Sequence, residues 1–202
     1  MPPTTPPTPD AIPLSLPEAD VVYYPHCFPA DESDMLMEIL TQTIAWQQER
    51  ITLYGRNIDV PRLVAWYGEE GKAYTYSGIL HHPRPWTPEL RAIKQRLETV
   101  AEVAFNSVLL NLYRHERDSV AWHSDDEPEL GVNPVIASVS FGATRRFQFK
   151  HKKKPKQRHD IDLTHGSLLL MRGPTQHRWL HQLPKSSRPC GPRINLTFRI
   201  IN

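Results

Sequence analysis

The sequence predicts a mainly β fold with flanking α-helices, in which the strands form a sandwich or a barrel. Seven short segments after residue 106 are rich in apolar and β-branched residues and are separated by turn residues. Two stretches before that point have helical periodicity instead, and no internal repeat or glycine-rich phosphate loop is found. Short strands at this spacing are typical of two packed sheets or of one sheet closed on itself.

The length of 202 residues suits one domain with a short extension. Residues 1–17 contain seven of the twenty prolines, a composition that favours disorder. We therefore expect a proline-rich disordered tail over residues 1–20 and a folded domain over residues 21–202.

Cysteine content and hydropathy indicate the cellular compartment of the protein. Cys27 and Cys190 are far apart and have no metal-binding spacing, which favours a reducing, intracellular compartment. No apolar run is long enough to span a bilayer, and the first residues lack the pattern of a secretory signal. We expect a monomer without membrane association, located in the cytoplasm of a bacterium or in the nucleus and cytoplasm of a eukaryote.

Two helices are predicted before the strands. The first runs from Asp31, a residue that can cap a helix, to about Gln48. The second starts at Thr87, where a threonine cap precedes a proline in the first turn. Each helix has one apolar face, formed by Leu36, Ile39, Leu40 and Ile44 in the first and by Leu90, Ile93, Leu97, Val100, Ala101 and Ala104 in the second.

The segment between the helices, at about residues 50–80, is rich in aromatic residues and interrupted by glycine and proline. This composition favours short strands and loops over a further helix. Most of the aromatic side chains are expected in the core, but so many in one loop-prone segment can also form a wall on which a planar ligand stacks. They are Tyr54, Trp66, Tyr67, Tyr74 and Tyr76.

The seven predicted strands occupy most of the chain after residue 106. They are SVLLNLYR, PVIASVSFG, RRFQFKH, HDIDL, GSLLLMR, RWLHQLP and RINLTFRII, at residues 107–114, 134–142, 145–151, 159–163, 166–172, 178–184 and 193–201. Alternate residues of a strand face opposite sides, so each strand can present one face to a core and another to a site.

Positive charge is concentrated in one stretch, residues 145–158, which we call the basic segment. It carries eight Lys and Arg residues and no acid, so the rest of the chain has a net charge of −6 (2 minus 8). Such a patch on an otherwise acidic protein favours a polyanionic partner, with nucleic acid first. A solvated hairpin tip explains the charge equally well.

The stretch SVAWHSDDEPELG, residues 119–131, contains a candidate metal site. His123 and Asp125 are two residues apart, so in an extended segment they point the same way and can bind one ion together. An imidazole and a carboxylate suit a divalent first-row metal, and a second histidine would complete the ligand set of non-haem Fe(II) oxygenases. By itself, H-x-D is a weak signal that surface loops also produce.

The last predicted strand, RINLTFRI, has two chemically different faces. Ile194, Leu196, Phe198 and Ile200 share one face, and Arg193, Asn195, Thr197 and Arg199 share the other. A surface strand would explain a polar face. Two arginines on one face also suit a dicarboxylic acid, because a guanidinium binds carboxylate at two points and stays charged in a site.

The second histidine of the proposed metal site has four candidates after the H-x-D motif: His159, His165, His177 and His181. His181 is favoured because RWLHQLP reads as a strand that comes just before the arginine-bearing strand in the sequence. His165 and His177 lie at predicted turns, where local roles are more usual.

Several segments in order resemble one known family. NLYRHERDSVAWHSDDEPELG, IASVSFGATRRF, HGSLLLM, WLHQLP and PRINLTFR together resemble the AlkB family of Fe(II)- and 2-oxoglutarate-dependent dealkylases. PRLVAWYG and YTYSG are most similar to the branch of the third human AlkB homologue. The resemblance runs from about residue 60 to the end of the sequence.

The resemblance implies a double-stranded β-helix (jelly roll) core with specific residue roles. Iron would be bound by His123, Asp125 and His181. The 2-oxoglutarate cosubstrate would be surrounded by Asn111, Tyr113, Arg193 and Arg199, with Asn195 and Thr197 completing its pocket. The flipped base would be contacted by Trp66, Tyr74, Tyr76, Asp126 and Glu127; Tyr74 and Tyr76 match the position that stacks on the base, and Glu127 matches an acidic position that reads its edge.

The implied reaction is oxidative demethylation of bases such as 1-methyladenine and 3-methylcytosine in DNA, with RNA as a further candidate substrate. It uses Fe(II), 2-oxoglutarate and O₂ and releases formaldehyde, succinate and CO₂, while the basic segment would contact phosphates. Two other classes stay open: a catalytically silent nucleic-acid-binding module, and an oxygenase of the same fold that acts on protein or a small metabolite.

Overall fold

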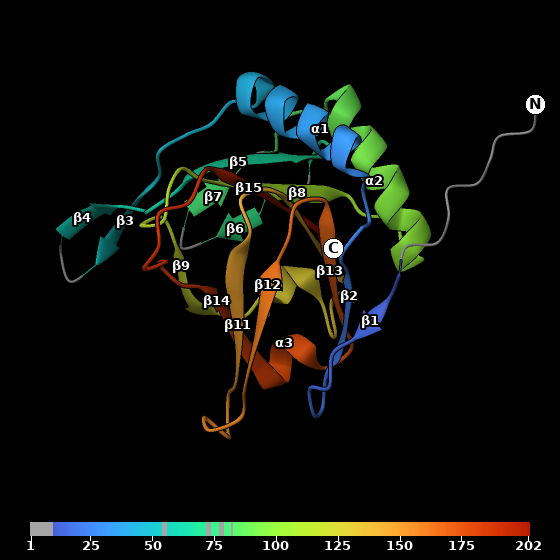
Figure 1. Ribbon diagram of the computed structural model, residues 1–202, viewed down its shortest axis with the longest axis vertical. Helices are drawn as coiled ribbons and strands as arrows, with labels where there is room; N and C mark the ends of the chain where they lie inside the picture. Colours follow the sequence, from blue (N-terminus) through green and yellow to red (C-terminus); the bar gives the residue numbers. More distant parts are fainter. Residues whose placement is uncertain (1–9, 54–55, 72–73, 77–78, 82) are drawn as a thin grey trace, which may run out of the picture.

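Two antiparallel sheets face each other, and two helices cover the outer face of the larger sheet (Figure 1). The computed structural model describes residues 10–202 except 54–55, 72–73, 77–78 and 82, and the side chains of residues 52–56 and 72–82 lie outside the described part as well. The mainly β fold class predicted from the sequence is confirmed.

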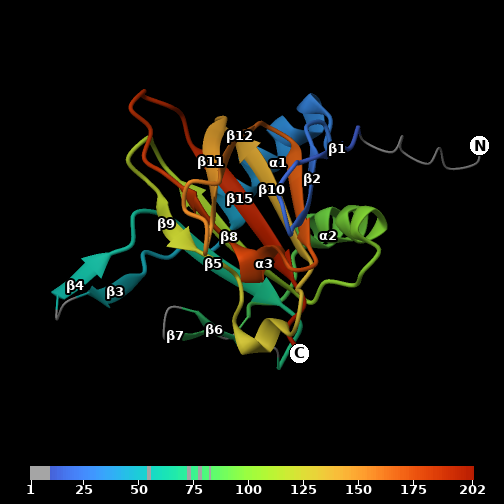
Figure 2. The same cartoon turned by 90° about the horizontal axis from the view of Figure 1, so that it is seen from below.

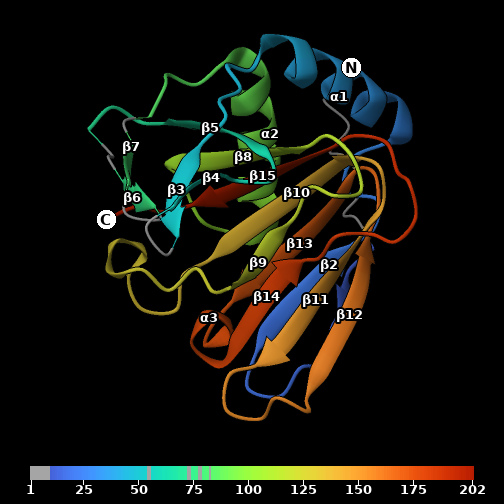
Figure 3. The ribbon, with the colours of Figure 1, turned by 90° about the vertical axis from the view of Figure 1, so that its left-hand side faces the viewer.

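The larger sheet has seven strands in the order β1-β2-β13-β10-β15-β8-β5, and the smaller has four in the order β12-β11-β14-β9. Figure 3 shows the smaller sheet in front of the larger one. The strands of the larger sheet are β1 (Ile12–Pro13), β2 (Asp20–Tyr24), β13 (Ser167–Arg172), β10 (Ile136–Gly142), β15 (Arg193–Arg199), β8 (Ser107–Tyr113) and β5 (Leu63–Gly68). Those of the smaller sheet are β12 (Arg158–Leu163), β11 (Arg145–His151), β14 (Trp179–Leu183) and β9 (Val120–His123).

Two hairpins lie outside these sheets. They are β3 (Arg50–Leu53) with β4 (Arg56–Asp59), and β6 (Tyr74–Tyr76) with β7 (Ile79–His81). The β3–β4 hairpin projects away from the body of the molecule (Figure 2). Both fall in the aromatic segment for which the sequence predicts short strands.

The helices are α1 (Ala30–Thr43), α2 (Pro88–Ala101) and the single turn α3 (Thr175–Arg178), with a short 3₁₀ turn at Pro128–Leu130. The start of α2 is as predicted, because the Thr87 side chain accepts a hydrogen bond from the backbone N–H of Leu90. The prediction for α1 was wrong at both ends. Asp31 lies in the first turn rather than at the cap, and the helix ends at Thr43 because Ile44 is extended and the chain then pairs with β5 at Gln47.

The alternation of side chains along β15 divides the interior into two layers. Ile194, Leu196 and Phe198 are fully buried in the core between the larger sheet and the helices. The four polar residues of the strand face the smaller sheet instead, and all seven residues of β15 are buried. A surface strand is therefore excluded, and the polar face lies inside the molecule.

The N-terminal segment differs from the expected disordered tail over residues 1–20. Leu16 is buried, and the indole N–H of Trp179 donates a 2.9 Å hydrogen bond to the carbonyl of Pro17. Residues 12–13 form β1, the edge strand of the larger sheet, which pairs with β2. Pro13 can occupy this edge strand because an edge position does not require its backbone to donate a hydrogen bond. Residues 1–9 lie outside the described residues.

All seven strands predicted after residue 106 are confirmed, with ends within about two residues of the prediction. Strand β9 is an additional strand in this part of the chain, and β1 and β2 are additional strands near the N-terminus. Among the described residues, none of the helices combines the length and the apolar character needed to cross a membrane.

Candidate active site

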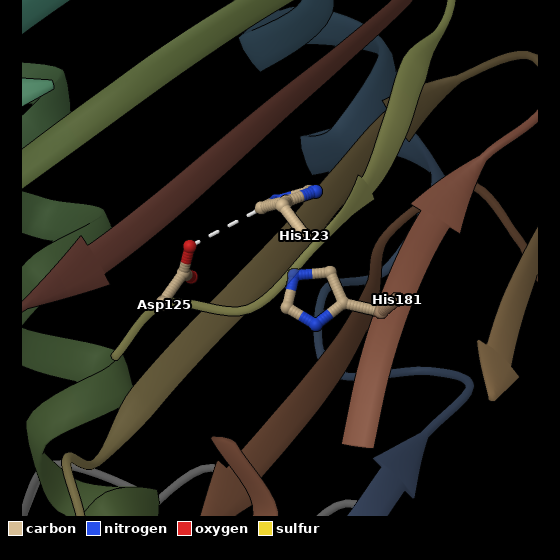
Figure 4. Close-up of side chains that lie close together, drawn as sticks. All are labelled: His123, Asp125 and His181. Atoms are coloured by element: carbon tan, nitrogen blue, oxygen red, sulfur yellow. Dashed lines mark ion pairs between the residues drawn. The ribbon is translucent and has the colours of Figure 1, made fainter. Parts of the chain in front are cut away.

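Three potential metal ligands converge where the smaller sheet faces the larger one (Figure 4). His123 ends β9, and His181 lies directly opposite it on β14. Asp125 follows two residues after the end of β9. The ligand atoms of the three residues all lie within 4.8 Å of one another, so the structure brings together the set that the resemblance implies.

The charge states of these side chains suit metal binding. Burial alone would raise the pKa of Asp125, but the charges of Arg199 and of the two histidines outweigh it and lower this pKa to about 2. Burial, together with the neighbouring His123, lowers the pKa of His181 to about 3. At neutral pH, Asp125 is therefore anionic and His181 neutral, which are the forms that bind a metal.

The tautomer of His123 is fixed by its own strand. Its Nδ1 atom lies 2.8 Å from the carbonyl oxygen of Ala121, and because a carbonyl can only accept, Nδ1 carries the proton. The Nε2 lone pair is then directed toward Asp125, whose Oδ1 lies 3.8 Å away. A hydrogen bond of this kind at the far nitrogen is the usual support for a histidine that binds a metal.

The carboxylate of Asp125 tests whether the ligand set fits Fe(II), because one of its oxygens is buried without a hydrogen-bond donor among the described residues. Its Oδ2 is 3.0 Å from Arg199 Nη2, whereas the buried Oδ1 accepts no hydrogen bond within the described part of the chain. A buried carboxylate oxygen without a donor is costly unless a cation meets it. Two imidazoles and one such oxygen form the face that non-haem Fe(II) oxygenases use, so the residues fit that metal.

One cavity continues from the three ligands into the space between the sheets. Its walls combine the polar face of β15 with apolar side chains of the facing strands. Lining residues include Asn111, Tyr113, Ser138, Phe147, Met171, Leu183, Arg193, Asn195, Thr197 and Arg199. All six residues predicted to surround 2-oxoglutarate thus line the same cavity as the metal ligands.

Arg193 supplies a buried positive charge in this cavity. Its guanidinium donates a 2.8 Å hydrogen bond to Ser140 Oγ and lies 5.3 Å from the centre of the Tyr113 ring. Its Nε atom is buried and donates no hydrogen bond within the described residues. Burial lowers the pKa of Arg193 to about 10, so the side chain stays charged at neutral pH. A buried cation with a spare donor suits the carboxylate of a ligand.

Arg199 has a contact that the sequence analysis did not predict, in addition to its place in the cavity. Both arginines of β15 were expected around the cosubstrate, and both do line the cavity. Arg199, however, also forms a buried ion pair with the metal ligand Asp125. The two arginines of one strand face therefore have different partners: Arg199 binds Asp125 at one end of the polar face, and Arg193 binds Ser140 at the other end.

The amides and hydroxyls between the two arginines form a connected wall. Asn195 Nδ2 donates to Ser138 Oγ and to the carbonyl of Val139, at 2.8 and 3.0 Å. Thr197 Oγ1 donates to Asn195 Oδ1 at 3.0 Å. These bonds fix the side chains of the wall, which gives a ligand a preformed surface.

Arg62 is a buried residue near the site that the sequence analysis did not predict. Its Nε atom donates a 2.7 Å hydrogen bond to Asn111 Oδ1, so the amide nitrogen of Asn111 is left to donate toward the cavity. The contact links β5 to β8, where Val64 pairs with Asn111. A single arginine before an apolar strand gives no sequence signal for this role, because the partner is 49 residues away.

Of the residues expected to contact the base, none lines the metal cavity within the described part of the chain. Trp66 is buried on β5. It lines a second pocket, together with Gln47, Glu49 and Arg84. Leu109 lines both this pocket and the metal cavity. Asp126 is exposed and its carboxylate lies 2.7 Å from Lys152 Nζ. Glu127 and Asp126 are not among the residues that line the metal cavity. The side chains of Tyr74 and Tyr76 lie outside the described residues.

The basic segment proves to be heterogeneous. It forms β11, the turn after it and the start of β12. Arg145 is buried and donates hydrogen bonds to the carbonyls of Asp118 and Pro184, so the expectation that the whole segment contacts phosphates is wrong for this residue. Lys150 lies 4.4 Å from the centre of the Trp122 ring on β9, and Lys152 pairs with Asp126 in the loop after β9. These two contacts connect the basic segment to the part of the chain that carries His123 and Asp125.

Comparisons with known proteins agree with this geometry. Residues 20–199 match the model of the 2OG-Fe(II) oxygenase superfamily. The chain is 46% identical over 190 residues to the human alpha-ketoglutarate-dependent dioxygenase alkB homolog 3, covering 90% of this chain and 66% of that relative. It is 41% identical over 179 residues to the human DNA oxidative demethylase ALKBH2, covering 85% of this chain and 69% of that relative.

A likeness among solved structures concerns the fold alone. The structure of OsALKBH1 superimposes with a TM-score of 0.64 at 15% sequence identity, covering 95% of this chain and all of that one. The chain spans about two thirds of the length of the alkB homolog 3 relatives that it matches. The double-stranded β-helix expected from the sequence is confirmed by this likeness and by the family match.

Proposed function

The chain belongs to the 2OG-Fe(II) oxygenase superfamily and, within it, to the AlkB family, and we propose that it removes N-linked methyl groups from damaged nucleic-acid bases by oxidation. The substrates we propose are bases such as 1-methyladenine and 3-methylcytosine in DNA, with RNA as a second substrate class. One observation carries the proposal most directly: the three ligand atoms within 4.8 Å share a cavity with the buried guanidinium of Arg193. Identities of 41–46% to oxidative dealkylases support the choice of substrate class.

Fe(II) and 2-oxoglutarate, when bound with O₂, supply the oxidation that converts an N-methyl group to a hydroxymethyl group, with succinate and CO₂ as products; the hydroxymethyl group then leaves as formaldehyde. His123, Asp125 and His181 would hold the metal. The protein contributes binding, orientation and electrostatics to such a reaction.

Arg193 and its neighbours would orient the cosubstrate. The charged guanidinium, with its free Nε donor, would bind the carboxylate that lies farther from the metal. The Asn111 amide, held by Arg62, would donate to the same molecule from the neighbouring strand. Because these donors are buried and held in place before any ligand binds, little reorganisation is needed on binding.

Apolar side chains of the cavity would exclude water from the reacting groups. Phe147 and Leu183 line it from β11 and β14 of the smaller sheet, opposite the polar face of β15, and Met171 lines it from β13 of the larger sheet. Phe147 also stacks on the His181 ring, with a centroid distance of 5.3 Å and an interplanar angle of 25°. A dry, rigid wall beside the metal restricts access to groups that bind in the intended orientation.

The acidic residues beside the metal ligands would favour a cationic lesion. Bases methylated at N1 of adenine or N3 of cytosine carry a positive charge at neutral pH, and Asp126 and Glu127 directly follow Asp125. Such lesions pair poorly, so flipping them out of a duplex costs less than flipping a normal base. We propose that Tyr76 stacks on the flipped base from the β6–β7 hairpin; base–aromatic stacking is worth about 1–3 kcal/mol.

A panel of oligonucleotides tests the proposal. Single- and double-stranded DNA and RNA, each with 1-methyladenine, 3-methylcytosine or no lesion, would be incubated with Fe(II) and 2-oxoglutarate, and formaldehyde and succinate would be measured together. We expect both products in equal amounts with the methylated strands. Nucleic-acid binding without turnover would indicate a silent module, and succinate formation that no methylated strand stimulates would indicate another substrate class.

A further inference from the structure

A buried hydrogen bond joins the turn before one metal ligand to the backbone of another. Gln176 lies in the single-turn helix α3, five residues before His181, and its side chain is fully buried. Its Oε1 atom accepts a 3.1 Å hydrogen bond from the backbone N–H of Asp125. Its Nε2 atom lies 3.4 Å from the sulfur of Met171, a residue that lines the metal cavity.

Asp125 depends on such a contact because it lies beyond the sheet. Strand β9 ends at His123, and the last register pair between β9 and β14 joins His123 to His181. The ladder that fixes the backbone of the two histidines therefore stops before the carboxylate ligand. The hydrogen bond to Gln176 holds the Asp125 backbone where the sheet no longer does.

The turn that carries Gln176 is itself fixed to the larger sheet. Thr175 Oγ1 donates a 2.6 Å hydrogen bond to the carbonyl of Arg172 at the end of β13 and accepts a 3.0 Å hydrogen bond from the backbone N–H of Asp20 at the start of β2. Thr175 is 1% exposed. Gln176 thus extends from an anchored turn to the metal ligand.

We propose that Gln176 is a positioning residue that directs Asp125 Oδ1 toward the metal. Asp125 is held at two points, by Gln176 at its backbone nitrogen and by Arg199 at Oδ2, which leaves Oδ1 as the oxygen that faces the two imidazoles. The inference rests on the iron site of the proposed function. Residues that orient a metal ligand in this way typically contribute about 10- to 100-fold to metal affinity.

Replacing the Gln176 amide with an apolar group distinguishes loss of the hydrogen bond to Asp125 from loss of packing. Gln176→Leu fills most of the same space but cannot accept the hydrogen bond from Asp125. Ser33→Ala is the matched control, because Ser33 is also fully buried and also bonds a backbone atom, the carbonyl of Phe28, but in α1 on the far side of the larger sheet. Both variants lose a buried polar contact, and Gln176→Leu alone loses one to a metal ligand.

Metal affinity of the metal-free proteins is the decisive measurement. Co(II) would be titrated into each protein and followed by its visible absorption, and thermal unfolding would be measured without metal. We expect Gln176→Leu to bind Co(II) about 10- to 100-fold more weakly than the natural protein, with an altered absorption spectrum, and Ser33→Ala to bind it as the natural protein does. Equal Co(II) affinity in Gln176→Leu and the natural protein would overturn the inference while leaving the iron site intact.

Failure of the natural protein to bind Co(II) would instead refute the iron site, and the inference with it. If Gln176→Leu does not fold, amide hydrogen exchange on the natural protein decides the question. We expect the Asp125 N–H to be protected in the metal-free protein, as a buried bonded amide should be. Exchange at the rate of an open loop would show that the contact to Gln176 does not hold this residue.

Discussion

The carboxylate of Asp125 lies 3.0 Å from Nη2 of Arg199, and both side chains are 3% exposed. This buried ion pair connects the loop after β9 to the last strand of the larger sheet, 74 residues later in the sequence (199 minus 125). It keeps Asp125 anionic and uses one of its two oxygens, so that the other is left for a metal. The same contact explains why a metal site and a buried arginine occur together.

Loss of the carboxylate should affect both metal binding and stability. In Asp125→Ala we expect no iron binding and no turnover, with nucleic-acid affinity largely retained. The metal-free variant should also unfold about 3–5 kcal/mol more easily, because Arg199 loses the buried carboxylate that offsets its charge. Urea unfolding measures this change. In the control Asp59→Ala, which removes an exposed pair with Arg50, the cost should be at most about 1 kcal/mol. Similar losses in the two variants would contradict the role of burial.

Removal of the Arg193 guanidinium should weaken the use of 2-oxoglutarate. A hydrogen bond to a charged group is worth about 1.5–3 kcal/mol, so Arg193→Ala should raise the KM for 2-oxoglutarate roughly ten- to a hundredfold. Metal affinity should be little changed, because the ion pair with Asp125 belongs to Arg199. Steady-state succinate formation measures the effect, with the exposed Arg188→Ala as control. An unchanged KM would mean that the cosubstrate is bound elsewhere.

The buried carboxylate of Asp118 should make stability depend on pH. Burial would raise its pKa, but hydrogen bonds from the backbone and side chain of Arg114 outweigh burial, and the pKa is lowered overall. A lowered pKa in the folded state means that the contribution is complete above the unfolded value of about 3.9 and is lost as the pH falls through the folded value.

Asp118→Asn should therefore lose stability at neutral pH and show a smaller decrease than the natural protein on acidification below about pH 4. Unfolding by urea between about pH 3 and pH 6 gives the two curves. The variant Asp59→Asn is the matched control, since the Asp59 carboxylate is also bound to an arginine but is exposed. Parallel curves for Asp118→Asn and the natural protein would show that this carboxylate does not contribute.

The turn of the basic segment should contact phosphates of the substrate. Lys153 and Lys156 lie in the turn between β11 and β12 and carry charge without the buried contacts of Arg145. Replacing both with alanine should weaken binding of a single-stranded oligonucleotide and reduce the slope of log affinity against log salt by about 0.7 per lost phosphate contact. Lys94→Ala, on α2 outside the larger sheet, is the control. Identical salt slopes in the natural protein and the double variant would place the nucleic acid on another surface.

The order of strands after residue 106 could be predicted from the sequence because turn residues separate short segments of alternating or apolar character. The helix start at Thr87 was also predictable from local sequence, because a threonine cap is followed by a proline. The ordered structure of residues 12–20 could not be predicted from the sequence, because their proline content predicts disorder. These residues are ordered because they pair at the edge of the larger sheet and because the Pro17 carbonyl accepts a hydrogen bond from the Trp179 indole.

In the candidate site, too, some features could be predicted from the sequence and others arise only from tertiary contacts. His123 and Asp125 are close in sequence and form a recognisable pair, and the alternation of RINLTFRI predicted the two faces of β15. Tertiary structure decided that His181 lies opposite His123 on a paired strand and that Arg199 binds Asp125. It also decided that Arg62 binds Asn111 and that Gln176 binds the backbone of Asp125. Periodicity follows from the local geometry of the chain, whereas contacts between residues about 50 apart arise only when the sheets close around a shared interior.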